Sequence, residues 1–354
     1  MNPVQIVQQY YFPDSKVDCA PIGSGLINHT FLVTIDEKKF VLQQINTGIF
    51  KKPYAIAENI SVVERFLTQH HPDYYFTTPV TAINGEQMIE SEDKTFWRLF
   101  PFVEDSYTID VVQTKEQAFE AAKQFGLFAK KLSDFPLEHL KITIPDFHNL
   151  NLRLQQFQSA LENGNQQRIR LSTNAINELQ GREQLVDEFN QRVNSGQWIQ
   201  RVMHHDTKIS NVLFSSNDEG ICVIDLDTIM PGYFLSDVGD MLRTYLSPVS
   251  EEETDFSKIT VRDSFFQSIA HGYAEPMSNE LTQQEKKDFV LAGELMIYMQ
   301  ALRFLTDFIN NDVYYGARYE LHNYNRALNQ IELLKRVEEK EEAWNQWLGQ
   351  YFKL

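Results

Sequence analysis

The spacing of hydrophobic residues changes once along the chain, from the alternation typical of strands to the three-and-four spacing typical of helices. Before about residue 103, short β-branched and aromatic runs such as TFLVTI and KFVLQQI lie between turn residues. This part is predicted to hold strands over 30–35 and 39–45, a helix over 55–67, and a hairpin of 88–91 with 95–103. The change of period predicts an N-terminal β-rich domain over 1–103 and a helical domain over 104–354, with the boundary in the linker 101–105.

Helices are predicted for most of the second part. Thr114 and Gln117 form a capping box at the start of a helix whose apolar face extends to Leu132. The segment 286–309 is apolar nearly all round, which is typical of a helix buried in a core. The other predicted helices are one or two polar-faced helices within 150–200, one over 263–273 and one over 326–347. The chain is therefore expected to be α+β.

Composition narrows the class of partner. The chain has 354 residues, of which 42% are hydrophobic, and it carries 49 acidic against 32 basic residues, a net charge of −17. Such a surface repels nucleic acid and anionic membranes, so neither is an expected partner. No basic, apolar leader begins the sequence, and no apolar run is expected to span a membrane. Cys19 and Cys222 lack metal-ligand or CxxC spacing, which favours a reducing, cytoplasmic location.

Residues 203–240 carry the candidate chemistry. The motif His204-x-Asp206-x4-Asn211 is followed by an apolar strand that ends on Asp225. In-line phosphoryl transfer needs a carboxylate that orients and deprotonates a hydroxyl, and an amide oxygen and a carboxylate that hold Mg²⁺ on the phosphates. The residue types, their spacing and the intervening strand all match this requirement, so the segment predicts phosphoryl transfer from ATP.

A glycine-rich turn precedes the first predicted strands. Gly23, Ser24 and Gly25 lie in the segment IGSGLIN, and glycines let backbone amides approach phosphate oxygens closely. A plain hairpin turn is the alternative interpretation. Its position ahead of the Asp–Asn–Asp motif favours a phosphate-binding loop.

These motifs resemble those of the aminoglycoside phosphotransferase and choline kinase family, relatives of protein kinases that phosphorylate small molecules. The resemblance covers almost the whole chain, in the blocks SGLINHTFLV, FVLQQINTGIF, HHDTKISNVLF, VIDLDTIMPG, LRFLTDF and DVYY. Within the family, the VLQQINT, DLDTIMPG and RFL blocks are similar to bacterial N-acetylhexosamine 1-kinases. The resemblance implies a bilobal protein-kinase-like fold, with a small antiparallel β lobe and a larger helical lobe. It also implies transfer of the ATP γ-phosphate to the anomeric hydroxyl of an N-acetylhexosamine.

For the nucleotide, the resemblance implies a site built from both lobes. Asn211 and Asp225 would coordinate Mg²⁺ on the ATP phosphates, and the linker backbone around Phe102 would bind the adenine. Gly23, Ser24 and Gly25 would line the phosphate loop. Protein kinases place a phosphate-pairing lysine on the strand that here carries Gln43. Lys208, two residues after Asp206, is the expected substitute for that cation.

For the acceptor, the resemblance implies that Asp206 grips and deprotonates the sugar hydroxyl. Arg303 and Tyr314 match positions that contact the sugar in the N-acetylhexosamine enzymes. Without the resemblance, Arg303 could equally form an ion pair with Asp307 one helical turn later. A buried arginine beside the acceptor argues against a cationic acceptor and favours a neutral sugar.

Several roles and functions stay open at this point. His204 is expected to hold the loop rather than to react, and Asp227 is more often a turn-capping residue than a second metal ligand. Asp237 and Asp240 are expected to cap the following helix and to brace the catalytic loop. The acceptor could instead be an aminoglycoside, choline, homoserine or methylthioribose. A catalytically silent kinase-like protein that binds a nucleotide is the remaining alternative, and the oligomeric state is not predicted.

Overall fold

The computed structural model describes residues 2–10, 15–22 and 28–354. In its first part, a five-stranded antiparallel sheet has the strand order β1-β2-β3-β5-β4. The elements of this part are α1 (Pro3–Val7), β1 (Val17–Pro21), β2 (His29–Ile35), β3 (Lys38–Ile45), α2 (Pro53–His70), β4 (Ile89–Glu90) and β5 (Phe96–Pro101). The predicted strands, helix and hairpin are confirmed, with bounds that differ by a few residues.

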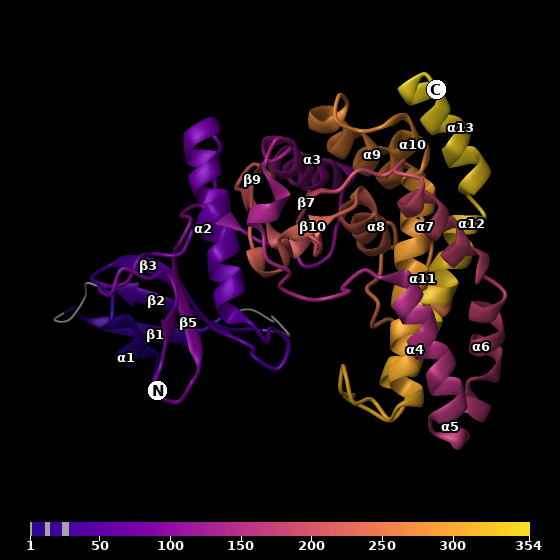
Figure 1. Ribbon diagram of the computed structural model, residues 1–354, viewed down its shortest axis with the longest axis horizontal. Helices are drawn as coiled ribbons and strands as arrows, with labels where there is room; N and C mark the ends of the chain where they lie inside the picture. The colour runs from indigo at the N-terminus through magenta and orange to yellow at the C-terminus, as the bar shows by residue number, and fades with distance from the viewer. Residues whose placement is uncertain (1, 11–14, 23–27) are drawn as a thin grey trace.

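The two faces of this sheet are covered differently. On one face, the α1 segment packs Ile6, Val7 and Tyr10 into a small core with inward-facing strand residues such as Leu42 and Leu99. Helix α2 belongs instead to the large core of the helical part. Figure 1 shows α2 standing between the sheet and the helices. The sheet is therefore joined to the rest of the molecule through α2.

The chain leaves the sheet after Pro101 and enters the helical part. Strand β6 (Ser106–Tyr107) already pairs with β8 (Val212–Ser215), which in turn pairs with β9 (Gly220–Val223). A second small sheet joins β7 (Arg201–Met203) to β10 (Met230–Gly232). These short strands enclose the 3-10 turns η2 (Ile209–Asn211) and η3 (Leu226–Thr228), and so carry the predicted catalytic segment.

Helices make up most of the chain after the sheet (Figure 1). The capping box is confirmed: the Thr114 hydroxyl accepts from the backbone of Gln117 at the start of α3. The helices are α3 (Lys115–Lys131), α4 (Leu150–Asn163), α5 (Gln166–Leu171), α6 (Thr173–Gln180), α7 (Gln184–Asn194), α8 (Phe234–Tyr245), α9 (Asp263–Met277), α10 (Gln283–Lys287), α11 (Phe289–Ile309), α12 (His322–Glu338) and α13 (Glu341–Phe352), with further 3-10 turns η1 (Leu137–His139) and η4 (Phe256–Lys258).

Two of the helix predictions are wrong in number. The region 150–200 holds α4 to α7 rather than one or two helices, and the single helix predicted over 326–347 is the pair α12 and α13. Helix α11 is buried as predicted. By length and composition it is also the one helix in the described part of the chain that could cross a membrane, contrary to the expectation from the sequence, but 78% of that window is buried inside the molecule. Its apolar surface is that of a core helix.

Candidate active site

Helix α8 holds the predicted catalytic loop in place. The buried carboxylate of Asp237 accepts hydrogen bonds from the backbone N–H groups of His204 (3.1 Å) and His205 (2.8 Å). Asp240 accepts from the backbone N–H of Thr207 at 2.9 Å. The N-cap of α8 is Tyr233 and makes no side-chain cap bond, so the two aspartates do not cap this helix. The bracing role is confirmed and the capping role is wrong.

The predicted base and its neighbour form an ion pair at the surface of this loop. Lys208 Nζ lies 3.2 Å from Asp206 Oδ2, and the two side chains are 45% and 19% exposed. The Asp206 carboxylate is the main cause of a raised Lys208 pKa. Asn211 donates its Nδ2 to the Asp206 carbonyl oxygen at 2.8 Å, which fixes the orientation of its amide group. The three predicted residues are therefore held together by short contacts.

Asp225 supplies the acidic end of the site. It lies two residues after the end of β9 and has a left-handed backbone conformation, with φ 59° and ψ 64°. The backbone N–H of Ile224 donates to the Asn211 carbonyl oxygen at 2.9 Å, which joins the strand end to the catalytic loop. Among the described residues, no hydrogen bond donor reaches the Asp225 carboxylate. Burial, and then the charges of Asp227 and Asp206, raise its pKa to about 7.

An unneutralised carboxylate beside an oriented amide suits a hard divalent cation. Mg²⁺ prefers oxygen ligands and keeps several water or phosphate ligands of its own. No cluster of three or more His, Cys, Asp or Glu side chains with metal-binding geometry occurs in the described ranges. The residues therefore fit a metal ion that arrives with phosphate oxygens rather than a closed protein cage.

Asp227 is held by the N-terminal sheet. Its carboxylate forms an ion pair with Arg98 Nη1, both side chains being almost fully buried, and accepts from Asn28 Nδ2 at 2.8 Å. The turn-capping role predicted for Asp227 is wrong. On the opposite side, Arg98 donates from Nε and Nη2 to Gln43 Oε1, at 3.0 and 2.8 Å. Arg98 was not predicted as a site residue, because its only mark in the sequence is a basic residue within the apolar run TFWRLFPFV.

The Lys–Glu pair of protein kinases has no counterpart at Gln43. Helix α2 holds two glutamates, of which Glu64 accepts from Thr78 and Gln87, at 2.9 and 3.0 Å. Glu58 is exposed. Neither reaches Gln43, whose described side-chain partner is Arg98.

The remaining nucleotide-binding predictions rest on sequence. Gly23, Ser24 and Gly25 lie outside the described residues. At Phe102, the backbone N–H donates to the Lys39 carbonyl oxygen at 3.2 Å, and Lys39 Nζ lies 5.3 Å from the Phe102 ring. The N–H and the ring of Phe102 are thus both in contact with Lys39.

Three aromatic side chains surround Arg303. Its guanidinium carbon is 5.6 Å from the Phe147 ring centroid, 5.8 Å from that of Tyr314 and 5.4 Å from that of Tyr315. Asp307 does not pair with it, because that carboxylate accepts from the backbone of Tyr314 and Tyr315 instead. No carboxylate in the described part of the chain lies within ion-pair distance of Arg303, whose one described hydrogen bond goes to Gln300 at 3.1 Å.

A row of aromatic contacts connects Arg303 to the catalytic loop. The His205 ring lies 5.3 Å from the His148 ring, which stacks on Phe147 at 4.4 Å. His205 also approaches the Met230 carbonyl oxygen at 3.2 Å, and a Cβ at Gly232 would lie 2.4 Å from its Cε1. A side chain at Gly232 would therefore displace the His205 ring. Burial lowers the pKa of His205 to about 4 and that of His148 well below its usual range.

His204 has the structural role predicted for it. Its Nε2 lies 2.9 Å from the Ile224 carbonyl oxygen, and its ring packs edge-on against Phe125 at 5.1 Å. Burial lowers its pKa. Cys222 is a buried residue of β9.

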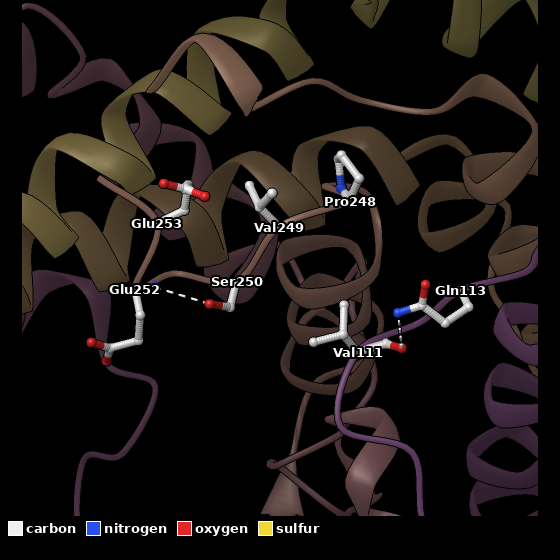
Figure 2. Close-up of a pocket in the computed structure, with 7 residues that line it drawn as sticks. All are labelled: Val111, Gln113, Pro248, Val249, Ser250, Glu252 and Glu253. Carbon is white, nitrogen blue, oxygen red and sulfur yellow. Dashed lines mark hydrogen bonds between the residues drawn. The ribbon is translucent and has the colours of Figure 1, made fainter. Parts of the chain in front are cut away.

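A surface recess of about 450 Å³ lies apart from these residues, between the segment after β6 and the loop that follows α8 (Figure 2). Its lining residues are Val111, Gln113, Pro248, Val249, Ser250, Glu252 and Glu253. Because this lining contains two carboxylates and no basic side chain, the recess is unsuited to the phosphates of ATP.

Known proteins match this chain in sequence family and in fold. The sequence profile of the phosphotransferase enzyme family (APH) matches residues 18–274. A microcompartment-associated aminopropanol kinase has a TM-score of 0.63 at 15% identity, with 96% of each chain covered. Choline kinase from Cryptosporidium parvum has a TM-score of 0.60 at 14% identity, over 99% of this chain and 100% of the other.

A third solved structure contains ligands. Spectinomycin phosphotransferase, in complex with ADP and spectinomycin, has a TM-score of 0.57 at 12% identity, over 95% of this chain and 97% of the other. Identities this low establish the fold alone. They confirm the predicted α+β, protein-kinase-like architecture.

Proposed function

Since the chain belongs to the phosphotransferase enzyme family, whose members transfer phosphate from ATP to small molecules, we propose that it is a sugar 1-kinase. Its acceptor is the anomeric hydroxyl of an N-acetylhexosamine, and its product is the sugar 1-phosphate. The observation that carries this proposal is the Arg303 guanidinium, which has three aromatic rings around it and no carboxylate partner among the described residues.

This arrangement favours a neutral, hydroxyl-bearing acceptor. Guanidinium N–H groups can donate to sugar hydroxyls and to an acetamido carbonyl, while aromatic faces cover the apolar side of the ring. A quaternary or primary ammonium group placed beside Arg303 would be repelled by a like charge that has no carboxylate partner among the described residues. The row from His205 through His148 to Phe147 supports placing such an acceptor next to Asp206.

The proposed reaction is direct, in-line transfer without a covalent enzyme intermediate. Asp206 accepts the proton of the anomeric hydroxyl, the sugar oxygen bonds to the γ-phosphorus, and the bond to the ADP oxygen breaks. Lys208 stays close enough to counter the charge that moves to the acceptor side. Asn211 and Asp225 would hold Mg²⁺, which supplies neutralisation of the phosphate charge when bound.

An acceptor panel tests the proposal. ADP release would be measured with Mg²⁺-ATP and N-acetylglucosamine, N-acetylgalactosamine, choline, homoserine, methylthioribose or an aminoglycoside, with Asp206→Asn as the control. We expect turnover with the N-acetyl sugars, phosphate on the anomeric oxygen by ³¹P NMR, and a rate at least about 100-fold lower in the control. Turnover with choline or an aminoglycoside alone would refute the sugar assignment and the role of Arg303.

A protein silent with the whole panel that still binds ATP would contradict the sugar assignment in a different way. It would indicate an acceptor outside the panel or a nucleotide-binding protein without activity. Turnover near the wild-type rate in the Asp206→Asn variant would remove Asp206 from the role of base.

A further inference from the structure

We infer that Arg98 binds the phosphates of the nucleotide, in the role that a strand lysine has in protein kinases. The inference rests on the use of ATP by this family and is independent of the acceptor. Arg98 on β5 lies directly opposite Gln43 on β3 in the antiparallel register. Gln43 occupies the position of the missing lysine, and its Oε1 accepts from Arg98 Nε and Nη2. The cation absent from β3 is thus supplied by the neighbouring strand.

The guanidinium of Arg98 is directed at the acidic end of the site. Its Nη1 pairs with Asp227, which lies two residues after Asp225 in the sequence. With a side chain only 1% exposed, it is a desolvated cation, for which electrostatic interactions are stronger than in water. The Phe100 ring, 5.1 Å from its guanidinium carbon, covers one face. A phosphate group bound between Asp225 and the sheet would lie next to the Arg98 guanidinium.

The ion pair between Arg98 and Asp227 lacks hydrogen-bond geometry. Arg98 Nη1 and Asp227 Oδ1 lie within ion-pair distance, yet both atoms are buried without a partner in hydrogen-bond geometry. A guanidinium group can donate five hydrogen bonds in a planar fork and is well suited to phosphate oxygens. Asp227 also keeps Asn28 as a donor on its other oxygen. Nη1 of Arg98 can therefore donate to a phosphate oxygen while Nε and Nη2 stay on Gln43 and Asp227 keeps its hydrogen bond from Asn28.

The role of Arg98 differs from that of Lys208. Lys208 lies on the catalytic loop beside Asp206 and is 45% exposed, where it can follow the phosphate as it moves. Arg98 is fixed by Gln43 inside the sheet, which suits a group that holds the nucleotide before transfer. Arginine and lysine would thus act on opposite sides of the transferred phosphate.

Nucleotide binding without metal or acceptor tests the inference. Isothermal titration in EDTA would compare ADP with adenosine for the wild type, Arg98→Met, Asp227→Asn and the double variant. We expect Arg98→Met to weaken ADP binding by about tenfold or more, and to leave adenosine binding unchanged. Asp227→Asn removes a competing carboxylate and should strengthen ADP binding. Arg65→Met, which removes an exposed cation of α2, is the matched control and should bind ADP like the wild type.

The double variant decides between phosphate binding and mere charge balance. It removes both buried charges together, so it is expected to fold even if Arg98→Met alone does not. Under our inference it still binds ADP about tenfold or more weakly than the wild type. Wild-type ADP affinity in the double variant would show that Arg98 serves only to neutralise Asp227. An equal loss of adenosine affinity would also overturn the inference. No sugar enters the measurement, so failure of the sugar proposal would leave this result untouched.

Discussion

At the scale of single residues, the ion pair between Lys208 and Asp206 is the contact most directly tied to the proposed chemistry. A cation that acts mainly as charge moves to the acceptor contributes to the transition state more than to substrate binding. We therefore expect Lys208→Ala to lower kcat by roughly 100-fold with little change in the KM for the sugar. Steady-state kinetics with the best acceptor of the panel would measure both constants.

A surface lysine provides the control for this variant. Lys258 is 54% exposed and pairs with Glu253 at 3.1 Å. Lys258→Ala removes the same charge and should leave kcat and KM unchanged. A rise in KM alone for Lys208→Ala would mean that Lys208 contacts the bound sugar instead.

Residues with a spacing motif were predictable, and residues defined by contacts across the fold were not. Asp206, Asn211 and Asp225 follow from one short segment and are brought together as expected. Arg98 becomes meaningful only once the register places it opposite Gln43, which no local pattern reveals. The sequence equally could not decide whether Arg303 pairs with Asp307.

At the scale of elements, helix boundaries were predictable where a capping residue or a glycine marks them in the sequence. The four helices within 150–200 were marked by breaks at Gly164 and Gly181 and by an N-cap at Asn165, signals that the polar composition obscured. The break between α12 and α13 has no such mark. It lets Trp344 stack on Phe266 at 4.2 Å, and this tertiary contact overrides the local helical preference.

The crossing of α3 and α9 depends on a glycine. A Cβ at Gly272 would lie 2.3 Å from the Phe119 carbonyl oxygen, so the two helices could not remain this close. We expect Gly272→Ala to destabilise the protein by roughly 1–3 kcal/mol, although alanine is the better helix former. Urea unfolding of the variant and the wild type, analysed with the same m-value, measures this change.

Gly349→Ala is the matched substitution. It lies within α13, and no atom is found within 4 Å of the position that its Cβ would take. Here helix propensity acts alone and should stabilise by about 0.5–1 kcal/mol. If both variants changed stability in the same direction, close packing at Gly272 would not be the cause.

At the scale of the whole molecule, the sheet and the helical part meet through a few polar contacts and through α2. On the sheet side, Arg98 forms an ion pair with Asp227, and Asn28 donates a hydrogen bond to it. Asn59 of α2 donates to the carbonyl oxygens of Lys141 and Ile229, both at 2.8 Å. All of these contacts except the one with Lys141 are made with η3 or with the residue directly after it. The placement of the sheet over the catalytic segment is therefore determined next to the proposed metal ligands.

The excess of acidic groups also reaches the core of the helical part. Glu294 of α11 is buried, and its Oε1 has no hydrogen-bond partner. Burial, and then the charges of Glu341, Glu338 and Glu188, raise its pKa to about 8. An unfolded chain releases this proton near pH 4.5, whereas the folded protein keeps it until about pH 8. Its contribution to stability is thus complete below pH 4.5 and is lost as the pH rises toward 8.

Replacing this acid should therefore help most in alkali. We expect the free energy of unfolding of Glu294→Met, relative to that of the wild type, to rise by on the order of 1 kcal/mol per pH unit between pH 4.5 and 8. Above pH 8 this difference should stay constant. Glu342→Gln removes an acidic side chain at an exposed position of α13 and should follow the wild type at every pH. Urea unfolding across this range measures the difference. A gap between Glu294→Met and the wild type that does not depend on pH would mean that the Glu294 proton is not retained by folding, and that the variant acts through packing alone.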